Sequence, residues 1–310
     1  MTGEKQAIRR IGVAGLGVVG EGAALDILQD DRLLLVGALV RDRSKKRHAA
    51  IDPDLIVDDA ETLFEAAPEI IVDAMSDGAA GRRLVDAALG KGVSVVTANK
   101  QAVAGAIGAL HEKAARNGAA VAYSASVGGG APMVETLRAV PDGAKIVEIK
   151  AILNGTVNFI LSELGGGANF DDAVKAAQDA GFAEADPSAD LSGLDARAKI
   201  AILSYEAFGA EPILDEIAVE GLDSEKATGF ANGPGAWRQI SRVSQKDGVI
   251  TARVAYEDVT DDPLFAKATG VDNAMRAIAA DGAVFEASGK GAGRGPTVSS
   301  VFADLNALLA

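Results

Sequence analysis

The chain has 310 residues and a formal net charge of −14, with 44 acidic side chains against 30 Lys and Arg. Nucleic acids and anionic membranes attract basic surfaces, so this balance argues against both as the main partner. The absence of cysteine excludes disulfides, thiolate metal sites and thiol nucleophiles. No apolar run approaches the roughly 20 residues of a membrane span, and the polar amino terminus lacks a signal-peptide core. We therefore expect a soluble, cytoplasmic protein, and the length allows two domains.

A glycine-rich turn follows the first apolar run of the chain. Residues 11–22 read IGVAGLGVVGEG and lead into a helical pattern over residues 23–28. In this G-x-G-x-x-G pattern, Gly15 permits a tight turn, Gly17 lets the backbone approach a pyrophosphate, and Gly20 lets the helix pack on the strand. The helix would also offer free N–H groups to the phosphates. The sequence predicts a dinucleotide site formed by Gly15, Leu16, Gly17, Val18, Val19 and Gly20.

The next expected strand, residues 33–40, ends in Arg41, and basic residues follow it up to Arg47. Folds that prefer NAD usually have an acid at this place, where it binds the ribose 2′-hydroxyl. A cluster of cations suits a 2′-phosphate instead, which favours NADP. Two alternatives remain, because the basic residues could form a solvated loop and Asp42 keeps NAD as the second choice.

Strands and helices continue to alternate up to residue 123. Expected strands at 70–74, 93–97 and 119–123 are separated by expected helices at 79–89 and 103–117. This alternation is typical of an α/β fold with a Rossmann-type, doubly wound parallel sheet. Ligands of such sheets bind beyond the carboxyl ends of the strands, where Ser76, Asn99 and Lys100 fall. We expect these three to contact the cofactor, although Lys100 could be an ordinary lysine at a helix start.

The second half of the chain predicts an α+β domain. A glycine turn at 126–132 would link it to the first domain, or act as a plain hinge. We place the dinucleotide-binding domain at residues 1–130 plus 291–310, and the substrate-binding and dimerisation domain at residues 131–290. The expected elements are strands at 146–153, 249–256 and 283–287, and helices at 133–139, 159–164, 170–180, 195–208 and 298–309.

An acid-rich stretch at residues 181–199 reads GFAEADPSADLSGLDARAK. On a helix, Asp195 and Lys199 lie on one face, where an amine beside a carboxylate can move a proton. The preceding acids could hold a cationic group of a substrate. Two structural interpretations compete: Ser192 and Asp195 match a capping box, and an Asp/Lys pair at this spacing can simply support a helix.

Taken together, these motifs resemble the homoserine dehydrogenase family. Ordered matches extend over nearly the whole chain, whereas residues 224–242 fit poorly. The chain ends where longer members continue into an ACT domain, so we expect that form of threonine feedback to be absent. The matching segments are GVAGLGVVG (12–20), TANK (97–100), SVGGGAP (126–132), NGTVNFIL (154–161), GFAEADPSADLSGLDARAKIAIL (181–203) and GKGAGRGPT (289–297).

The resemblance implies a homodimer that interconverts aspartate 4-semialdehyde and homoserine with NAD(P). Lys199 would be the proton donor and acceptor, Asp195 its acidic partner, and Lys100 the lysine between nicotinamide and substrate. The substrate would be bound by Glu184, Asp190, Gly155 and Thr156, and Gly291 would contact the cofactor.

One position departs from the family pattern. Family members usually have a Glu at position 124 that helps a monovalent cation site, and this chain has Ser124. The carbonyls of Val127, Gly129 and Ala131 remain candidate ligands. Two other functions stay open: a paralogue that reduces a related amino-acid aldehyde or ketone, and a catalytically silent NADP sensor. The presence of Lys100, Asp195 and Lys199 together argues against the sensor.

Overall fold

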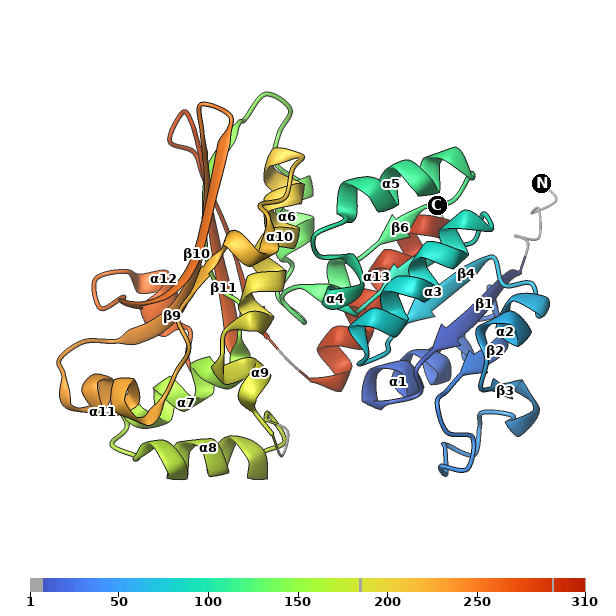
Figure 1. Cartoon of the computed structure of the whole chain (residues 1–310), viewed down its shortest axis with the longest axis horizontal. Coiled ribbons are helices and arrows are strands. Elements are labelled where there is room, and N and C mark those ends of the chain that lie inside the picture. The colour runs from blue at the N-terminus through green and yellow to red at the C-terminus, as the bar shows by residue number, and fades with distance from the viewer. Residues whose placement is uncertain (1–7, 184–185, 292, 310) are drawn as a thin grey trace, which may run out of the picture. The chain divides into compact units, whose positions relative to one another are not determined.

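A computed structural model of the chain describes residues 8–183, 186–291 and 293–309 (Figure 1). The chain divides into two compact units. The first unit contains residues 1–103, 108–126 and 294–310, and the second contains residues 104–107 and 127–293. Among the described residues, no helix has both the length and the apolar character needed to cross a bilayer.

The first unit is built on a six-stranded sheet in the order β3-β2-β1-β4-β5-β6, in which every pairing is parallel. This confirms the doubly wound sheet predicted from the alternation of strands and helices. The strand order reverses between β1 and β4, the place where sheets of this kind bind ligands. The strands are β1 (Arg9–Ala14), β2 (Leu33–Leu39), β3 (Ile56–Val57), β4 (Ile70–Asp73), β5 (Ser94–Thr97) and β6 (Val121–Ala122).

The helix predicted over residues 103–117 is broken in the structure. A short helix α4 (Lys100–Val103) ends before Gly105, whose φ of +77° leaves the helical region. The carboxylate of Glu211 accepts the backbone N–H groups of Gly105 at 2.6 Å and Ile107 at 2.7 Å, so these two N–H groups at the break have hydrogen-bond partners. Helix α5 (Ile107–Arg116) begins after this break.

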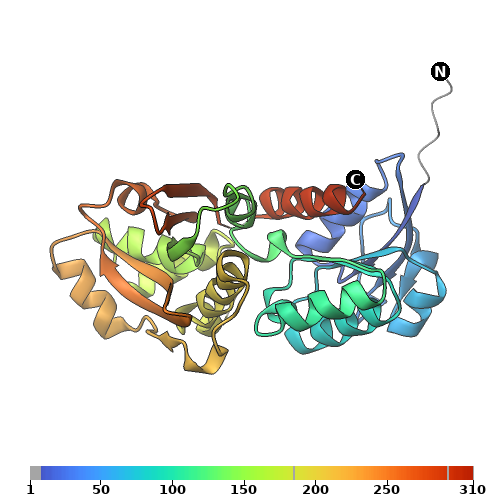
Figure 2. The same ribbon diagram turned by 90° about the horizontal axis from the view of Figure 1, so that it is seen from above.

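The remaining helices of the first unit include one from the end of the chain. Helix α13 lies beside α1, as Figure 2 shows, and a Cβ at Gly22 of α1 would come within 2.8 Å of Val298 of α13. The absence of a side chain at Gly22 therefore allows the two helices to pack closely. These helices are α1 (Val18–Ile27), α2 (Ala60–Glu65), α3 (Gly78–Gly90) and α13 (Arg294–Leu309), with 3₁₀ turns η1 (Pro53–Leu55) and η2 (Ser124–Ser126).

The second unit is an α+β unit with a mixed sheet in the order β12-β11-β7-β9-β10-β8. Only the pairing of β10 with β8 is parallel among the pairings described for this sheet. The long strands β9 and β11 and helix α11 are not among the elements expected from the sequence. The strands are β7 (Ile146–Ile152), β8 (Ala218–Val219), β9 (Trp237–Lys246), β10 (Val249–Asp258), β11 (Asp272–Ala279) and β12 (Val284–Lys290).

Helices α6, α7 and α10 contact this sheet. Because side chains alternate between the faces of a strand, the fully buried Ile149 and Ala151 of β7 share one face and Glu148 and Lys150 occupy the other. The helices of this unit are α6 (Met133–Arg138), α7 (Gly155–Gly165), α8 (Phe170–Asp179), α9 (Ser188–Leu191), α10 (Leu194–Phe208), α11 (Ser224–Asn232) and α12 (Pro263–Lys267), with the 3₁₀ turn η3 (Leu214–Glu216).

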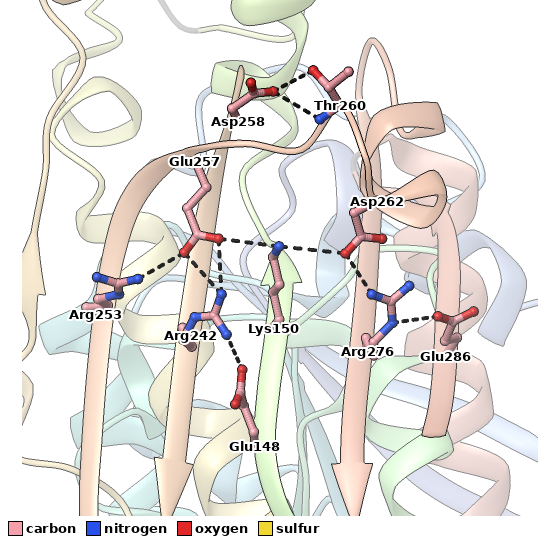
Figure 3. Close-up of polar contacts among 10 residues, drawn as sticks. All are labelled: Glu148, Lys150, Arg242, Arg253, Glu257, Asp258, Thr260, Asp262, Arg276 and Glu286. Carbon is pink, nitrogen blue, oxygen red and sulfur yellow. Dashed lines mark hydrogen bonds and ion pairs between the residues drawn. The ribbon is translucent and has the colours of Figure 1, made fainter. Parts of the chain in front are cut away.

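The face that carries Lys150 bears a row of cations across four neighbouring strands. In register, Arg276 lies opposite Lys150, Lys150 opposite Arg242, and Arg242 opposite Arg253. Like charges so placed repel one another, and acids interleave with them (Figure 3). Glu257 contacts Lys150 at 3.3 Å and both Arg242 and Arg253 at 3.1 Å. The other acids of this charged network are Glu148, which bonds Arg242, Asp262, which contacts Lys150 and Arg276, and Glu286, which contacts Arg276.

Candidate active site

In the first unit, the glycine turn between β1 and α1 has the geometry that a dinucleotide requires. Gly15 has a φ of +87°, and a Cβ there would lie 2.8 Å from the carbonyl oxygen of Ala74. A Cβ at Gly20 would overlap the carbonyl oxygen of Gly15. At Gly17, by contrast, a Cβ would meet no atom of the described residues within 4 Å, and the structure describes no side-chain hydrogen bond capping α1 there. Gly15 and Gly20 therefore serve packing, while Gly17 leaves open the approach to the helix N-terminus.

The other residues predicted from this motif lie at different depths. Leu16 is buried in the core of the first unit, and Val19 is half-buried against it. Val18 is 68% exposed at the first residue of α1. The Leu16 side chain is therefore enclosed by the core, whereas the Val18 side chain lies at the surface of the turn.

The basic segment after β2 is tied to the glycine turn. The guanidinium of Arg47 donates to the carbonyl oxygen of Leu16 at 2.9 Å and to that of Asp42 at 3.3 Å. Arg41 is exposed, and its charge is among the smaller causes, after the backbone N–H of Ala80, that lower the pKa of Asp77. Arg41 is therefore an exposed cation near the start of α3, where it could meet a phosphate.

Polar groups cluster where β4 and β5 end. The carboxylate of Asp73 accepts the N–H of Met75 at 3.0 Å and the hydroxyl of Thr97 at 3.0 Å. Asn99 is buried and donates from its amide to the carbonyl of Asp77 at 3.2 Å, and Lys100 follows as the first residue of α4. Of the three residues predicted at this edge, Ser76 is exposed, Asn99 is buried and Lys100 is half-buried.

Asp73 was not among the residues that the sequence predicted for the site. It is 0% exposed, and burial raises its pKa to about 6 despite the two hydrogen bonds that it accepts. The signal available in the sequence was an acid at the end of the otherwise apolar strand IIVD. Its partner Thr97 belongs to the TANK segment, but only the pairing of β4 with β5 places the two side chains together.

In the second unit, Lys199 and Asp195 form a largely buried pair on α10. The ammonium of Lys199 donates to a carboxylate oxygen of Asp195 and to the carbonyl oxygen of Leu153, both at 2.8 Å. The two charged side chains are 13% and 10% exposed. Among the described residues, these contacts occupy two of the three N–H donors of an ammonium, which leaves one for a substrate oxygen. The carbonyl of Leu153 is a main-chain group at the end of β7, so no residue type could reveal it.

The structure overturns the capping-box interpretation. Helix α10 begins at Leu194 with Gly193 as its N-cap, in the left-handed region at a φ of +77°. The hydroxyl of Ser192 donates instead to the carbonyl of Ala189 at 3.0 Å, at the end of α9. The tight turn at Gly193 separates the two helices, so Ser192 does not cap α10.

The start of α7 lies close to the same pair. Asn154 caps this helix by accepting the N–H of Val157 at 3.0 Å, and its amide donates to the carbonyl of Asp190 at 3.2 Å. Its neighbour Leu153 supplies the carbonyl that Lys199 contacts. Leu153 and Asn154, which are adjacent in the chain, therefore connect the Lys199/Asp195 pair to Asp190.

The other predicted substrate residues are constrained by their neighbours. Thr156 donates its hydroxyl to the carbonyl of Phe182 at 2.8 Å, which ties α7 to the acid-rich stretch. A Cβ at Gly155 would lie 3.0 Å from the carbonyl oxygen of Val271, so the helix start fits closely against that loop. Glu184 lies outside the described residues.

The glycine turn at residues 127–131 also belongs to the second unit. Gly128 and Gly129 have positive φ angles, and the N–H of Gly130 donates to the carbonyl of Lys290 at 2.8 Å. A Cβ at Gly129 would lie 2.6 Å from the carbonyl oxygen of Gly291, and a Cβ at Gly291 would strike the buried amide of Asn273. The two glycine segments therefore pack backbone to backbone.

The candidate cation ligands Val127, Gly129 and Ala131 are all buried in this turn, and Ser124 is buried in the first unit. The carbonyl of Ala131 accepts the N–H of Met133 at 2.8 Å. Within residues 8–183, 186–291 and 293–309, no three His, Asp or Glu side chains are grouped as metal ligands would be. Any cation here would depend on main-chain carbonyls.

Comparison with known protein families gives matches over most of the chain. A profile described as homoserine dehydrogenase matches residues 132–305, and one described as homoserine dehydrogenase, NAD binding domain, matches residues 15–124. The chain is 35% identical to the homoserine dehydrogenase of Synechocystis sp., over 96% of this chain and 72% of that protein. It is 31% identical to the Bacillus subtilis protein of that name, over 97% and 72%.

Solved structures agree. A homoserine dehydrogenase from Thiobacillus denitrificans superimposes with a TM-score of 0.88 at 31% identity, over 98% of this chain and 74% of that one. A hyperthermophilic archaeal homoserine dehydrogenase in complex with NADPH gives a TM-score of 0.83 at 28% identity, over 97% of both chains.

Proposed function

Because the chain belongs to the homoserine dehydrogenase family, we propose that it interconverts L-aspartate 4-semialdehyde and L-homoserine, with NADP(H) as its preferred cofactor. The observation that carries this proposal is the largely buried ammonium of Lys199, which donates to the carboxylate of Asp195 and to the carbonyl of Leu153. Such a group can give a proton to an oxygen that becomes an alkoxide, and can take the proton back in the reverse direction.

The bound nicotinamide supplies or accepts the hydride. In the reducing direction, the electrons of the carbonyl double bond move to the aldehyde oxygen, and Lys199 donates a proton to it. The carboxylate of Asp195 and the carbonyl of Leu153 each accept a hydrogen bond from this ammonium, and together they fix its direction. In the oxidising direction, the neutral amine of Lys199 accepts the hydroxyl proton. Lys100, at the start of α4, is proposed to lie between the nicotinamide and the substrate.

The acids beside this pair are proposed to hold the α-ammonium group of the substrate. Asp190 is half-buried, and its main chain is held by Asn154. A carboxylate and an ammonium form charge-assisted hydrogen bonds, which are stronger than neutral ones. Gly155 and Thr156, at the start of α7, would line the same pocket, and Glu184 would be a second acid.

The preference for NADP(H) is supported by the basic segment that follows β2. Arg41 is exposed there, and Arg47 ties the segment to the glycine turn at Leu16. A guanidinium binds a phosphate through paired hydrogen bonds, whereas an acid would suit the free 2′-hydroxyl of NAD. NAD(H) is the second choice, because Asp42 is half-buried in the same segment. Gly291 is proposed as a further cofactor contact.

A substrate panel with both nicotinamide cofactors tests the proposal. We expect oxidation of NADPH to depend on aspartate 4-semialdehyde and to be faster than oxidation of NADH at equal concentration. Turnover of other amino-acid aldehydes or ketones in its place would identify a paralogous reductase. Binding of NADPH without turnover of any member of the panel would identify a sensor.

The homodimer and the cytoplasmic location stay predictions. We propose that the second unit supplies the contact between subunits. Analytical ultracentrifugation checks this, since a monomer at micromolar concentration would contradict it.

A further inference from the structure

Asp73 is a buried acid at the carboxyl edge of the first sheet, and none of the groups proposed for proton transfer uses it. It is the last residue of β4, where it pairs with Ala14 of β1 on one side and with Thr97 of β5 on the other. This position lies where the strand order reverses. Burying a carboxylate is costly, and an apolar side chain of similar size would fill the same space at lower cost. Packing alone therefore does not explain a carboxylate at this position, and the groups that it hydrogen-bonds indicate its role.

Those hydrogen bonds reach the next strand and the turn that follows it. The hydroxyl of Thr97 donates to Asp73 at 3.0 Å, and the same oxygen accepts the N–H of Asn99 at 2.9 Å. In parallel, the N–H of Ala98 donates to the main-chain carbonyl of Asp73 at 2.9 Å. Asp73 therefore holds two consecutive residues of the turn, one through its backbone and one through Thr97. The next residue is Lys100, with which α4 begins.

The surroundings leave this turn little freedom. A Cβ at Gly81 of α3 would strike the amide of Asn99 and would lie 3.1 Å from the carboxylate of Asp73. The carbonyl of Thr97 accepts the hydroxyl of Ser126 at 2.8 Å. The side chain and the main chain of Thr97 are thus both engaged, so its rotamer fixes the direction in which the Asn99 N–H points.

The place of the turn in the sheet indicates which part of a dinucleotide it faces. The glycine turn after β1 takes the pyrophosphate, and the end of β2 takes the ribose of the adenosine half. Strands β4 and β5 lie on the opposite side of β1 from β2. Their ends therefore serve the other half of the crevice, which receives the nicotinamide nucleotide.

We propose that Asp73 is a positioning residue for the nicotinamide half of the cofactor, because it fixes, through the hydroxyl of Thr97, the turn that presents Asn99 and Lys100. The inference rests on the proposed function only in that a nicotinamide cofactor binds. It does not depend on which aldehyde is reduced.

The test compares two ligands in the full-length protein by fluorescence titration or calorimetry: NADPH, and 2′,5′-ADP, which lacks the nicotinamide nucleotide. If the wild type binds NADH instead, NADH and ADP replace them. Thr97→Val deletes the hydroxyl at nearly constant volume and should weaken NADPH about tenfold or more, as expected for a lost buried hydrogen bond to a charged group. Binding of 2′,5′-ADP should stay within about twofold. Thr97→Ser keeps the hydroxyl and should restore NADPH affinity.

Asp73→Asn is the second variant, because it leaves one carbonyl oxygen for two donors, the N–H of Met75 and the hydroxyl of Thr97. It should also weaken the binding of NADPH much more than the binding of 2′,5′-ADP. Thr62→Val is the matched control. Thr62 donates its hydroxyl to Asp59 at 2.6 Å, in the same chemistry but at the exposed start of α2. The affinity of Thr62→Val for either ligand should equal that of the wild type. The proposal is overturned if Thr97→Val or Asp73→Asn binds NADPH as tightly as the wild type does. It is also overturned if either variant loses affinity for NADPH and for 2′,5′-ADP by the same factor. Failure of Thr97→Val to fold leaves the decision to Asp73→Asn.

Discussion

The ammonium of Lys199 lies 2.8 Å from the carboxylate of Asp195 and 2.8 Å from the carbonyl oxygen of Leu153. The first contact is local to α10, while the second comes from Leu153, which directly follows β7 and lies 46 residues earlier in the chain. Both charged side chains are nearly buried, unlike the exposed pair of Lys175 and Asp179 at the same spacing on α8. Burial therefore distinguishes the pair on α10, which we propose for proton transfer, from the solvent-exposed pair on α8.

Lys199→Met should lower kcat by about 10²–10⁴-fold, the usual contribution of a general acid, while the Kd for NADPH stays unchanged. Steady-state kinetics and fluorescence titration measure the two quantities. Lys175→Met removes the cation of the exposed pair at the same spacing and should leave both unchanged. If Lys199→Met weakened NADPH binding as strongly as turnover, a structural role for Lys199 would be indicated instead.

Gly17→Ala should leave the free energy of unfolding nearly unchanged and abolish tight binding of NADPH. A methyl group at Gly17 meets no atom of the described chain within 4 Å, yet it would stand where the pyrophosphate approaches the helix. Urea unfolding and NADPH titration check the two halves of the prediction. Gly20→Ala is the contrast, since its Cβ would overlap the Gly15 carbonyl and should destabilise the first unit. Normal NADPH affinity in Gly17→Ala would exclude the turn from the cofactor site.

Arg41→Asp should move the preference from NADPH towards NADH. The exchange removes a cation suited to the 2′-phosphate and adds an acid suited to a 2′-hydroxyl. We expect the ratio of kcat/KM for NADPH to that for NADH to fall by about 10-fold or more, in line with the loss of a charge-assisted contact. Arg116→Asp, at a 70% exposed side chain on α5, is the matched control. An unchanged ratio would remove Arg41 from cofactor selection.

Glu257→Gln should destabilise the second unit by about 2–4 kcal/mol, because it removes the negative charge that the neighbouring cations of Glu257 contact (Figure 3). Burial opposes the charge of Glu257, but Arg242 and Lys150 outweigh it and lower its pKa. The stabilisation is therefore present at neutral pH and is lost as the pH falls through that lowered pKa. Urea unfolding measures the difference. Asp179→Asn, in the exposed pair on α8, should cost less than about 1 kcal/mol, and an equal cost for both would contradict the prediction.

Asp73→Asn should change how stability depends on pH. Burial raises the pKa of Asp73 to about 6 from 3.8, so between these values the folded protein keeps a proton that the unfolded chain has released. The free energy of unfolding should therefore fall as pH rises from about 4 to 6, by about 3 kcal/mol from this group. The difference between wild-type and variant unfolding curves across pH isolates that contribution. Parallel curves would show that Asp73 does not titrate in this range.

Local features of the sequence determined a large part of this protein. The Gly15–Gly20 turn, the strands of the parallel sheet and the Asp195/Lys199 spacing depend on residues close together in the chain, so periodicity and turn chemistry were sufficient to find them. The limit of this information appears at Gly105, where a continuous helical pattern is broken because Glu211, far along the chain, binds the N–H groups at the break.

Only the tertiary structure decided which distant groups meet. The hydroxyl of Thr97 reaches Asp73 because β4 and β5 pair in one register. The carbonyl of Leu153 reaches Lys199 because β7 ends beside α10. Such contacts depend on how strands and helices pack, and a main-chain carbonyl has the same chemistry at every residue. The sequence could therefore predict the amine of Lys199 and the acid of Asp195, but not the Leu153 carbonyl oxygen that orients the amine.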